Sequence, residues 1–377
     1  MPRTPLLVLL AAFAAGCDDG KPVNTDPDAA TPVDSAAPPP HVVAYVSGYG
    51  PDIAWYDFDP ATGALAMAGK VAAFAGSPSF LAIRHDAANV STHLYAVSES
   101  TNRVGAYAID SGTGALTFIN DVSTGGNGPA HVSVDGTGHY VLVANYGDGK
   151  VSVFPVRADG GLEAASQTLS AGANAHQIIA DPSNTHVVVP CKGADYLAQY
   201  DFASGTLSPS TPPRTMTAGG AGPRHVAWGR SERFLYLVNE NDSTVTAFDY
   251  LPSGIMPLKT LSTRAADATG NNTGAEIVVA MDGNDTIYVS NRGDDNIAVL
   301  SGRGGYEYPP LMLLGHVPTG GQTPRMIALY GRWLLSANQD SNTVTTFEIQ
   351  SRMPVPTGDS LSFSKPSFVG FAELPPQ

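Results

Sequence analysis

One sequence pattern recurs along most of this chain at intervals of about 50 residues. Each copy holds a short apolar segment, a Gly, Asp or Asn turn, a second apolar segment such as Leu94–Val97, a polar turn, and two more segments joined by a glycine-containing hairpin. The six copies begin at Ser77, Gly128, Asn174, Gly222, Gly274 and Thr323. Four short strands per unit are typical of a β-propeller, whereas helical repeats would show apolar residues at a spacing of about 3.6 residues.

A seventh unit is divided between the two ends of the chain. The segment from His41 to Leu65 matches the later part of every copy but has no opening strand. Pro366–Phe371, near the C-terminus, can supply that strand. We therefore predict an all-β fold, a seven-bladed β-propeller with four antiparallel strands per blade. The N- and C-terminal strands pair in one blade, which closes the ring and leaves no free sheet edge.

The first 40 residues differ from the repeats in composition. Residues 1–16 combine an early arginine, a short apolar run and small residues before Cys17, as in a bacterial lipoprotein signal peptide. We expect a lipid on Cys17, a disordered Pro-, Ala- and Asp-rich tether over residues 17–40, and the propeller domain over residues 41–377. This predicts an exported protein, anchored by its lipid to a bacterial membrane in the periplasm or at the cell surface. The alternative is an ordinary secretory signal cleaved near Gly16.

The composition narrows the classes of function. A net charge of −14 at pH 7 argues against a nucleic-acid partner, and we expect a monomer with a self-repelling surface. The chain has only two cysteines, so a lipid on Cys17 leaves Cys191 without a disulfide partner. We expect Cys191 to pack in the core, with a nucleophilic role as the alternative. Because motifs such as Gly-x-Ser-x-Gly, His-Glu-x-x-His, Cys-x-x-Cys and Gly-Lys-Ser/Thr are missing, we predict neither a cofactor nor a metal.

Residues that differ from blade to blade are expected to gather at one face of the ring. In an antiparallel four-stranded blade, the start of the first strand and the end of the second lie on the same face, close to the axis. The polar residues at these two positions are Glu99, His131, Tyr146, His176, Arg224, His225, Glu240, Glu276, Arg292 and Arg325. Three arginines in so few positions of an acidic protein concentrate positive potential there, which suits an anionic substrate. The alternative is a structural role, in which these side chains hold neighbouring blades together.

The motifs around these positions resemble a known family. The most specific are Gly222-Pro223-Arg224-His225, Asn239-Glu240, Asn272 to Ile277, and Ser290-Asn291-Arg292-Gly293. With their flanks, residues 42–371 resemble the lactonase-type seven-bladed propeller family, which includes the propeller form of 6-phosphogluconolactonase and the fungal 3-carboxy-cis,cis-muconate cyclase. The resemblance implies catalytic roles for His176, Arg224, Glu240 and Arg292. The residues expected to bind the substrate are His131, Tyr146, His225, Glu276 and Arg325.

One departure from the family pattern bears on the substrate. The family often has His-x-His in the fourth blade, and Asn174 replaces the first of these histidines. This change could weaken the binding of a phosphate or sugar. An exported protein would also not meet a phosphorylated intermediate of the pentose pathway, so we expect a different sugar lactone or a relaxed specificity.

The resemblance suggests a hydrolytic mechanism. His176, with a pKa of about 6 to 7, would act as general base on a water that attacks the lactone carbonyl. Arg224 and Arg292 would hold the substrate anion and stabilise the developing oxyanion. Glu240 would orient an arginine or the histidine, or protonate the leaving ring oxygen. The alternatives are a muconate-cycloisomerase-like lactonising enzyme that uses the same residues, and a non-catalytic binding propeller at the cell surface.

Overall fold

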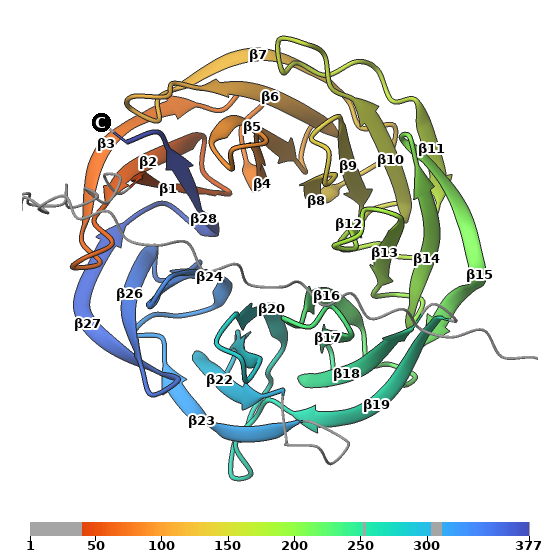
Figure 1. Cartoon of the computed structure of the whole chain (residues 1–377). Helices are drawn as coiled ribbons and strands as arrows, with labels where there is room; N and C mark the ends of the chain where they lie inside the picture. Colours follow the sequence, from red (N-terminus) through yellow and green to blue (C-terminus); the bar gives the residue numbers. More distant parts are fainter. Residues whose placement is uncertain (1–39, 252–253, 303–310, 377) are drawn as a thin grey trace, which may run out of the picture. The chain divides into compact units, whose positions relative to one another are not determined.

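Seven four-stranded antiparallel sheets are arranged in a ring in the computed structural model of this protein (Figure 1). The structure describes residues 40–251, 254–302 and 311–376. The predicted fold is confirmed, with seven blades of four strands each. The predicted signal peptide, the lipid on Cys17 and the tether up to residue 39 lie outside the described residues. Within the described residues, no helix is long and apolar enough to cross a membrane.

The blades are numbered here in chain order. Blade 1 contains β28 (Pro366–Leu374), β1 (His41–Gly48), β2 (Asp52–Phe58) and β3 (Leu65–Ala72). Blade 2 contains β4 (Pro78–His85), β5 (Ser91–Ser98), β6 (Arg103–Ile109) and β7 (Leu116–Ser123). Blade 3 contains β8 (Pro129–Val134), β9 (Tyr140–Asn145), β10 (Lys150–Pro155) and β11 (Gln167–Ser170), and blade 4 contains β12 (Ile179–Ala180), β13 (His186–Cys191), β14 (Tyr196–Ala203) and β15 (Thr206–Met216). Blade 5 contains β16 (Pro223–Trp228), β17 (Phe234–Asn239), β18 (Thr244–Leu251) and β19 (Gly254–Ser262); blade 6 contains β20 (Gly274–Ala280), β21 (Thr286–Asn291), β22 (Asn296–Ser301) and β23 (Met312–Pro318); blade 7 contains β24 (Pro324–Tyr330), β25 (Trp333–Asn338), β26 (Thr343–Gln350) and β27 (Met353–Ser362).

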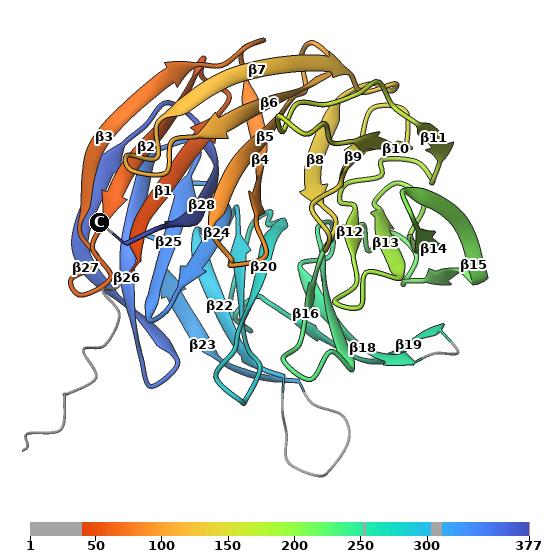
Figure 2. The ribbon, with the colours of Figure 1, turned by 45° about the horizontal axis from the view of Figure 1, so that its top comes forward.

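The two ends of the propeller close the ring within blade 1. β28 pairs antiparallel with β1, in a register that runs from His41 opposite Leu374 to Val46 opposite Val369. This confirms the predicted split blade. The first strand of each blade lies nearest the axis and the fourth lies at the rim, as Figure 2 shows for β4 and β7.

The hydrophobic core lies between neighbouring blades rather than at one centre. Seven clusters of buried apolar side chains each join two adjacent blades. The apolar residues of the repeats therefore face the next sheet, and each blade depends on both neighbours. Cys191 is fully buried in one of these clusters. Burial raises the pKa of its thiol to about 12, which fits a packing residue and not a nucleophile.

Blade 4 differs from the others at its innermost strand. β12 is only two residues long, and the chain before it meets β13 at an isolated bridge between Ala175 and Cys191. The side-chain amide of Gln177 instead pairs with blade 5, because its Oε1 accepts from Val226 N at 2.7 Å and its Nε2 donates to Val226 O at 3.3 Å. The backbone next to His176 is thereby fixed against the neighbouring blade.

Candidate active site

Six side chains occupy the same position in their respective blades, at one end of the ring. Each follows the second strand of its blade, and its backbone N–H donates to the carbonyl of a residue that precedes the innermost segment, at 2.7–3.1 Å. These residues are Tyr49, Tyr146, Lys192, Glu240, Arg292 and Gln339. The shared hydrogen bond fixes the backbone while the side chain differs, so this position can carry function without disturbing the fold.

A cavity of about 280 Å³ lies at this end of the ring. It is lined by Glu99, Gly128, Ala130, Tyr146, Gly147, His176, Glu240, Arg292 and Arg325. Six of the ten polar residues predicted to gather at this face line it, namely Glu99, Tyr146, His176, Glu240, Arg292 and Arg325. The other four, His131, Arg224, His225 and Glu276, are buried and do not line it. The predicted set thus divides into a layer that faces the cavity and a layer behind it.

Glu240 is paired with three cationic side chains. Its Oε1 lies 2.7 Å from Lys192 Nζ and 3.0 Å from Arg292 Nη2, and its Oε2 lies 3.1 Å from Arg224 Nε. Burial alone would raise the pKa of Glu240, but the cations around it lower that pKa to about 2. Glu240 is therefore ionised at neutral pH. It can anchor the three cations but holds no proton to donate, which argues against the predicted alternative in which it protonates a leaving group.

Arg224 lies behind Glu240 and is 2% exposed. Its Nη1 donates to the carbonyl of Ala275 in blade 6 at 2.5 Å. Burial and the charge of Arg292 lower the pKa of Arg224 to about 10, so it remains a cation at neutral pH. This placement favours a supporting role for Arg224, in which it contributes charge and holds Glu240, over direct contact with a substrate.

His176 and two buried residues form a hydrogen-bonded chain across three blades. His176 Nδ1 lies 3.1 Å from His225 Nε2, and His225 Nδ1 lies 2.9 Å from Oε2 and 3.0 Å from Oε1 of Glu276. His176 Nε2 makes no hydrogen bond to any residue that the structure describes. Burial and the nearby charge of Arg224 hold the pKa of His176 well below its ordinary value. His176 is thus neutral at pH 7, with a lower pKa than the sequence alone indicated.

His131 lies beside this chain without being hydrogen-bonded to it. Its ring lies 4.4 Å from that of Phe80 and 5.5 Å from that of His225, and its Nδ1 accepts from Ile178 N at 3.4 Å. Burial and the neighbouring His225 hold its pKa well below the ordinary value. The placement favours packing of the inner strands over substrate contact.

Aromatic rings border the cationic side chains of the cavity. The guanidinium of Arg325 lies 5.3 Å from the ring centre of Tyr49, whose hydroxyl donates to Glu99 Oε1 at 3.3 Å. Tyr146 lies between Lys192 Nζ, 6.0 Å from its ring centre, and the His176 ring at 5.4 Å. Each cation thus lies against an aromatic ring of a neighbouring blade.

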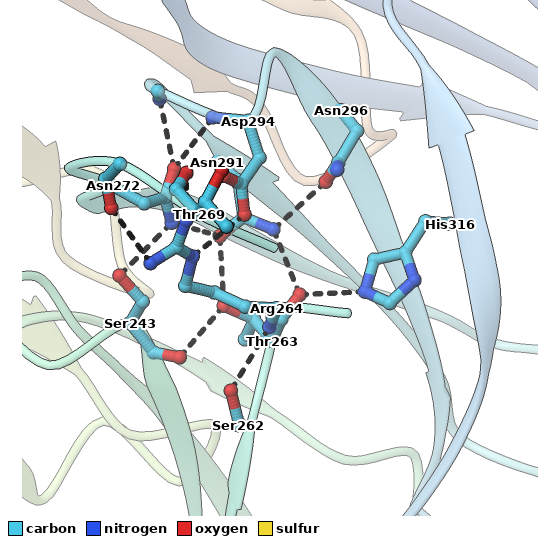
Figure 3. Close-up of polar contacts among 12 residues, drawn as sticks. Ser243, Ser262, Thr263, Arg264, Thr269, Asn272, Asn291, Asp294, Asn296 and His316 are labelled. Carbon is cyan, nitrogen blue, oxygen red and sulfur yellow. Dashed lines mark hydrogen bonds and ion pairs between the residues drawn. The ribbon is translucent and has the colours of Figure 1, made fainter. Parts of the chain in front are cut away.

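A polar cluster holds the turn that carries Arg292 (Figure 3). Asn272 Oδ1 accepts from the backbone N–H groups of Gly293 and Asp294 at 2.8 and 2.9 Å. Arg264 pairs with Asp294 through two bonds, Nε to Oδ2 at 2.9 Å and Nη2 to Oδ1 at 2.7 Å. Arg264 also donates to two backbone carbonyls of its own loop. This clamp fixes the position of Arg292 at the cavity.

Asn174, the departure from the family pattern, has a local structural role. Its φ is 56°, a left-handed conformation that asparagine tolerates better than most residues. Its Nδ2 donates to the carbonyl of Tyr146 at 3.2 Å. The residue therefore shapes the turn before His176 and does not line the cavity.

Two residues of the site, Lys192 and Tyr49, were not included in the predicted set. Both occupy the shared position after the second strand of a blade. Cys191 precedes Lys192 where most blades have an asparagine, and Tyr49 belongs to the blade that is split between the termini. An alignment that treated blade 1 as a seventh copy would have identified Tyr49, whereas Lys192 was already recognisable as the residue after the second strand of blade 4.

A larger cavity, of about 570 Å³, lies away from these residues, between blades 4 and 5. Its lining includes Asp181, His186, Gln199 and Tyr250, and it contains none of the predicted site residues. Size alone therefore does not identify the functional cavity of this propeller. Among the residues described, no three or more His, Cys, Asp or Glu side chains are grouped so that they could hold a metal ion.

Known proteins resemble this chain over nearly its whole propeller. The sequence model of the family described as "Lactonase, 7-bladed beta-propeller" matches residues 41–371. The chain is 32% identical to the 6-phosphogluconolactonase of Bacillus subtilis (strain 168) over 325 residues, which cover 82% of this chain and 90% of the relative. It is 34% identical over 272 residues to the 6-phosphogluconolactonase of Pectobacterium atrosepticum, covering 71% of this chain and 79% of the relative.

A solved structure shows the same architecture. The periplasmic gluconolactonase of Pseudomonas aeruginosa superimposes with a TM-score of 0.81 and 28% sequence identity. The match covers 89% of this chain and 99% of that one. The similarity therefore extends through all seven blades.

Proposed function

The chain belongs to the lactonase family of seven-bladed β-propellers, and from this premise we propose that it hydrolyses the ring ester of a sugar lactone in the cavity lined by His176. The names of its relatives support this substrate class, since two of them are 6-phosphogluconolactonases and a structural neighbour is a gluconolactonase. We propose residues 41–377 as the catalytic domain.

The observation that carries the proposal is a neutral histidine that faces the same cavity as two arginines. His176 lines the cavity with Arg292 and Arg325, and its depressed pKa leaves an unprotonated ring nitrogen at neutral pH. A lone pair beside fixed positive charges suits the attack of water on an ester carbonyl, because the base takes a proton while the cations stabilise the negative charge that forms on oxygen.

The reaction would proceed through a tetrahedral intermediate. His176 Nε2 takes a proton from a water molecule whose oxygen bonds to the carbonyl carbon, and Arg292 and Arg325 stabilise the resulting oxyanion. The bond from that carbon to the ring oxygen then breaks, and the proton passes to the ring oxygen, which yields a hydroxy acid. Glu240 holds Arg292 in place, while Arg224 adds positive potential from behind.

The charges around the cavity also favour an acidic product or an anionic substrate. Lys192, Arg292 and Arg325 face the same region as Glu240, whose charge balances only part of theirs. The predicted lipid on Cys17 would place the enzyme outside the cytoplasm, as the name of the periplasmic relative also suggests. We propose an aldonolactone met outside the cytoplasm as the substrate.

The experiment that tests this function is acid release from a panel of aldonolactones, with and without a phosphate group. Full-length protein in detergent is compared with a protein-free reaction, because lactones also open spontaneously. We expect at least one lactone to open faster with the protein. If no lactone opens faster than it does without protein, the proposed function is wrong.

A further inference from the structure

We propose that His225 and Glu276 extend His176 into a proton relay, so that the proton taken from water at the cavity comes to rest on Glu276. The relay rests on the proposed function, because it assigns the destination of a proton that lactone hydrolysis releases. It assigns positioning roles to two residues that do not line the cavity.

The geometry of the relay is continuous from the cavity to the interior. His176 lines the cavity, His225 lies between it and blade 6, and Glu276 lies at the buried end on β20. The two links are 3.1 Å from His176 Nδ1 to His225 Nε2 and 2.9 Å from His225 Nδ1 to Glu276 Oε2. His225 is 1% exposed and Glu276 is 5% exposed, so solvent does not compete for these protons.

The charge on Glu276 dictates the tautomers along the chain. A carboxylate can only accept, so His225 Nδ1 carries the hydrogen and His225 Nε2 carries the lone pair. That lone pair accepts from His176 Nδ1–H, which leaves His176 Nε2 unprotonated toward the cavity. An ionised Glu276 therefore makes His176 a base, and a protonated Glu276 reverses both hydrogen bonds and leaves His176 with an Nε2–H.

The electrostatic surroundings explain why the proton would not remain on an imidazole. Burial and the charges of Arg224, Arg325 and Arg292 hold the pKa values of His176 and His225 well below their ordinary range. Burial raises the pKa of Glu276 to about 7, although Arg224 and His131 act in the opposite direction. The form with a neutral carboxylic acid at the buried end is thus more stable than the form with a cationic imidazolium beside arginines.

The ionisable groups that influence the relay come from several elements. They are Arg224 and His225 on β16, His131 on β8, Arg292 after β21, Arg325 on β24, and Glu240 after β17. Of these, Arg224 and Arg292 are paired with Glu240. At the buried end, Glu276 itself is paired with His225, and its Oε1 accepts from the backbone N–H of Ile277 at 3.1 Å.

The proton transfer balances without any further reactant. His176 Nε2 gains the proton from water, His176 Nδ1 gives its proton to His225 Nε2, and His225 Nδ1 gives its proton to Glu276. Both histidines end neutral in the opposite tautomer, Glu276 ends as a carboxylic acid, and the hydroxide oxygen bonds to the carbonyl carbon. The reverse transfer returns a proton to the ring oxygen when the ester bond breaks.

The relay predicts one ionisation in the pH profile. Below about pH 7, Glu276 is already protonated and His176 cannot act as a base, so kcat/KM falls with slope one as the pH decreases. Above that pH, Glu276 is ionised and kcat/KM reaches a plateau.

The first test is the pH profile of kcat/KM for full-length wild type, Glu276→Gln and the control Asp285→Asn. Glutamine can accept from His225 but cannot take up a proton, so we expect a loss of about 100-fold in kcat/KM and no ionisation near neutrality. Asp285 is another buried carboxylate of the same blade, 1% exposed, and its variant should keep the wild-type profile. An unchanged ionisation in Glu276→Gln would overturn the relay and leave the proposed function intact.

The second test needs neither activity nor a folded variant at Glu276. ¹⁵N NMR of the wild type reports whether each ring nitrogen of His176 carries hydrogen, with the signals assigned by their loss in His176→Gln. We expect Nε2 to be unprotonated at about pH 8 and protonated at about pH 6, with the ring neutral at both. The same tautomer at both pH values, or an imidazolium at about pH 6, would overturn the relay even if no lactone is opened.

Discussion

Glu240 in blade 5 and Arg292 in blade 6 form an ion pair, with 3.0 Å between Oε1 and Nη2. The same carboxylate also pairs with Lys192 of blade 4 and Arg224 of blade 5. One anion thus joins three blades at the face where the candidate active site lies. The arrangement concentrates cations at the cavity and makes their positions depend on one side chain.

Glu240→Gln tests this dependence. The variant leaves three partly or fully buried cations without their counter-charge, so we expect the free energy of unfolding to fall by about 3–5 kcal/mol. We also expect KM for an aldonolactone to rise, because Arg292 loses its anchor. Urea unfolding and steady-state kinetics measure the two effects.

The matched control for that variant is Glu348→Gln. Glu348 pairs with Arg332 at 3.1 Å on an exposed part of blade 7, where loss of an ion pair costs at most about 1 kcal/mol. Equal losses of stability in the two variants would contradict the central role of Glu240.

The free energy of unfolding of the propeller should vary with pH because of Glu276. Its folded pKa of about 7 lies above the unfolded value of about 4.3. The folded state therefore binds the proton more tightly, and the stabilisation is fully present below about pH 4 and lost as the pH rises through about 7. Relative to Glu276→Gln, wild type should lose about 2–4 kcal/mol of stability between these pH values. A difference between the two proteins that does not vary with pH, measured by urea unfolding, would argue against the raised pKa.

The clamp on Arg292 gives a prediction at a residue that lies outside the cavity. Asp294→Asn weakens the paired bonds to Arg264, so the turn that carries Arg292 should become less well fixed. We expect kcat/KM to fall about 10-fold, since small displacements of a positioning group lower the rate. Asp249→Asn is the matched control, because Asp249 makes a similar two-bond pair with Arg233 outside the site. The account of the clamp fails if both variants reduce kcat/KM equally.

The fold could be predicted from the sequence because every blade has the same packing requirement. Each sheet must bury both faces against its neighbours, so apolar strands and polar turns recur with one period. The missing strand of the split blade was identifiable for the same reason, and β28 fills that place. Sequence position also identified the cavity-facing His176, Glu240 and Arg292, since the start of a first strand and the end of a second strand lie at the same face.

Whether the other predicted site residues face the cavity or are buried behind it could not be predicted in this way. The start of the inner strand carries the same register irregularity in several blades, for example between Pro223 and His225 and between Pro324 and Met326. Nevertheless Arg224 is buried whereas the equivalent Arg325 lines the cavity, so position in the repeat does not tell whether a residue faces the cavity. His225 and Glu276 were expected to bind substrate, whereas they lie behind His176. The pKa values also depend on contacts between blades that no local motif encodes.

The measurement that tests the account most directly is kcat and KM for lactone hydrolysis by wild type and His176→Gln above neutral pH. Glutamine is similar in size and polar, but it cannot accept a proton from water. The account predicts a loss of about 10²–10⁴-fold in kcat with little change in KM, because Arg292 and Arg325 remain. A kcat for His176→Gln close to that of wild type would contradict the assignment of His176 as the base.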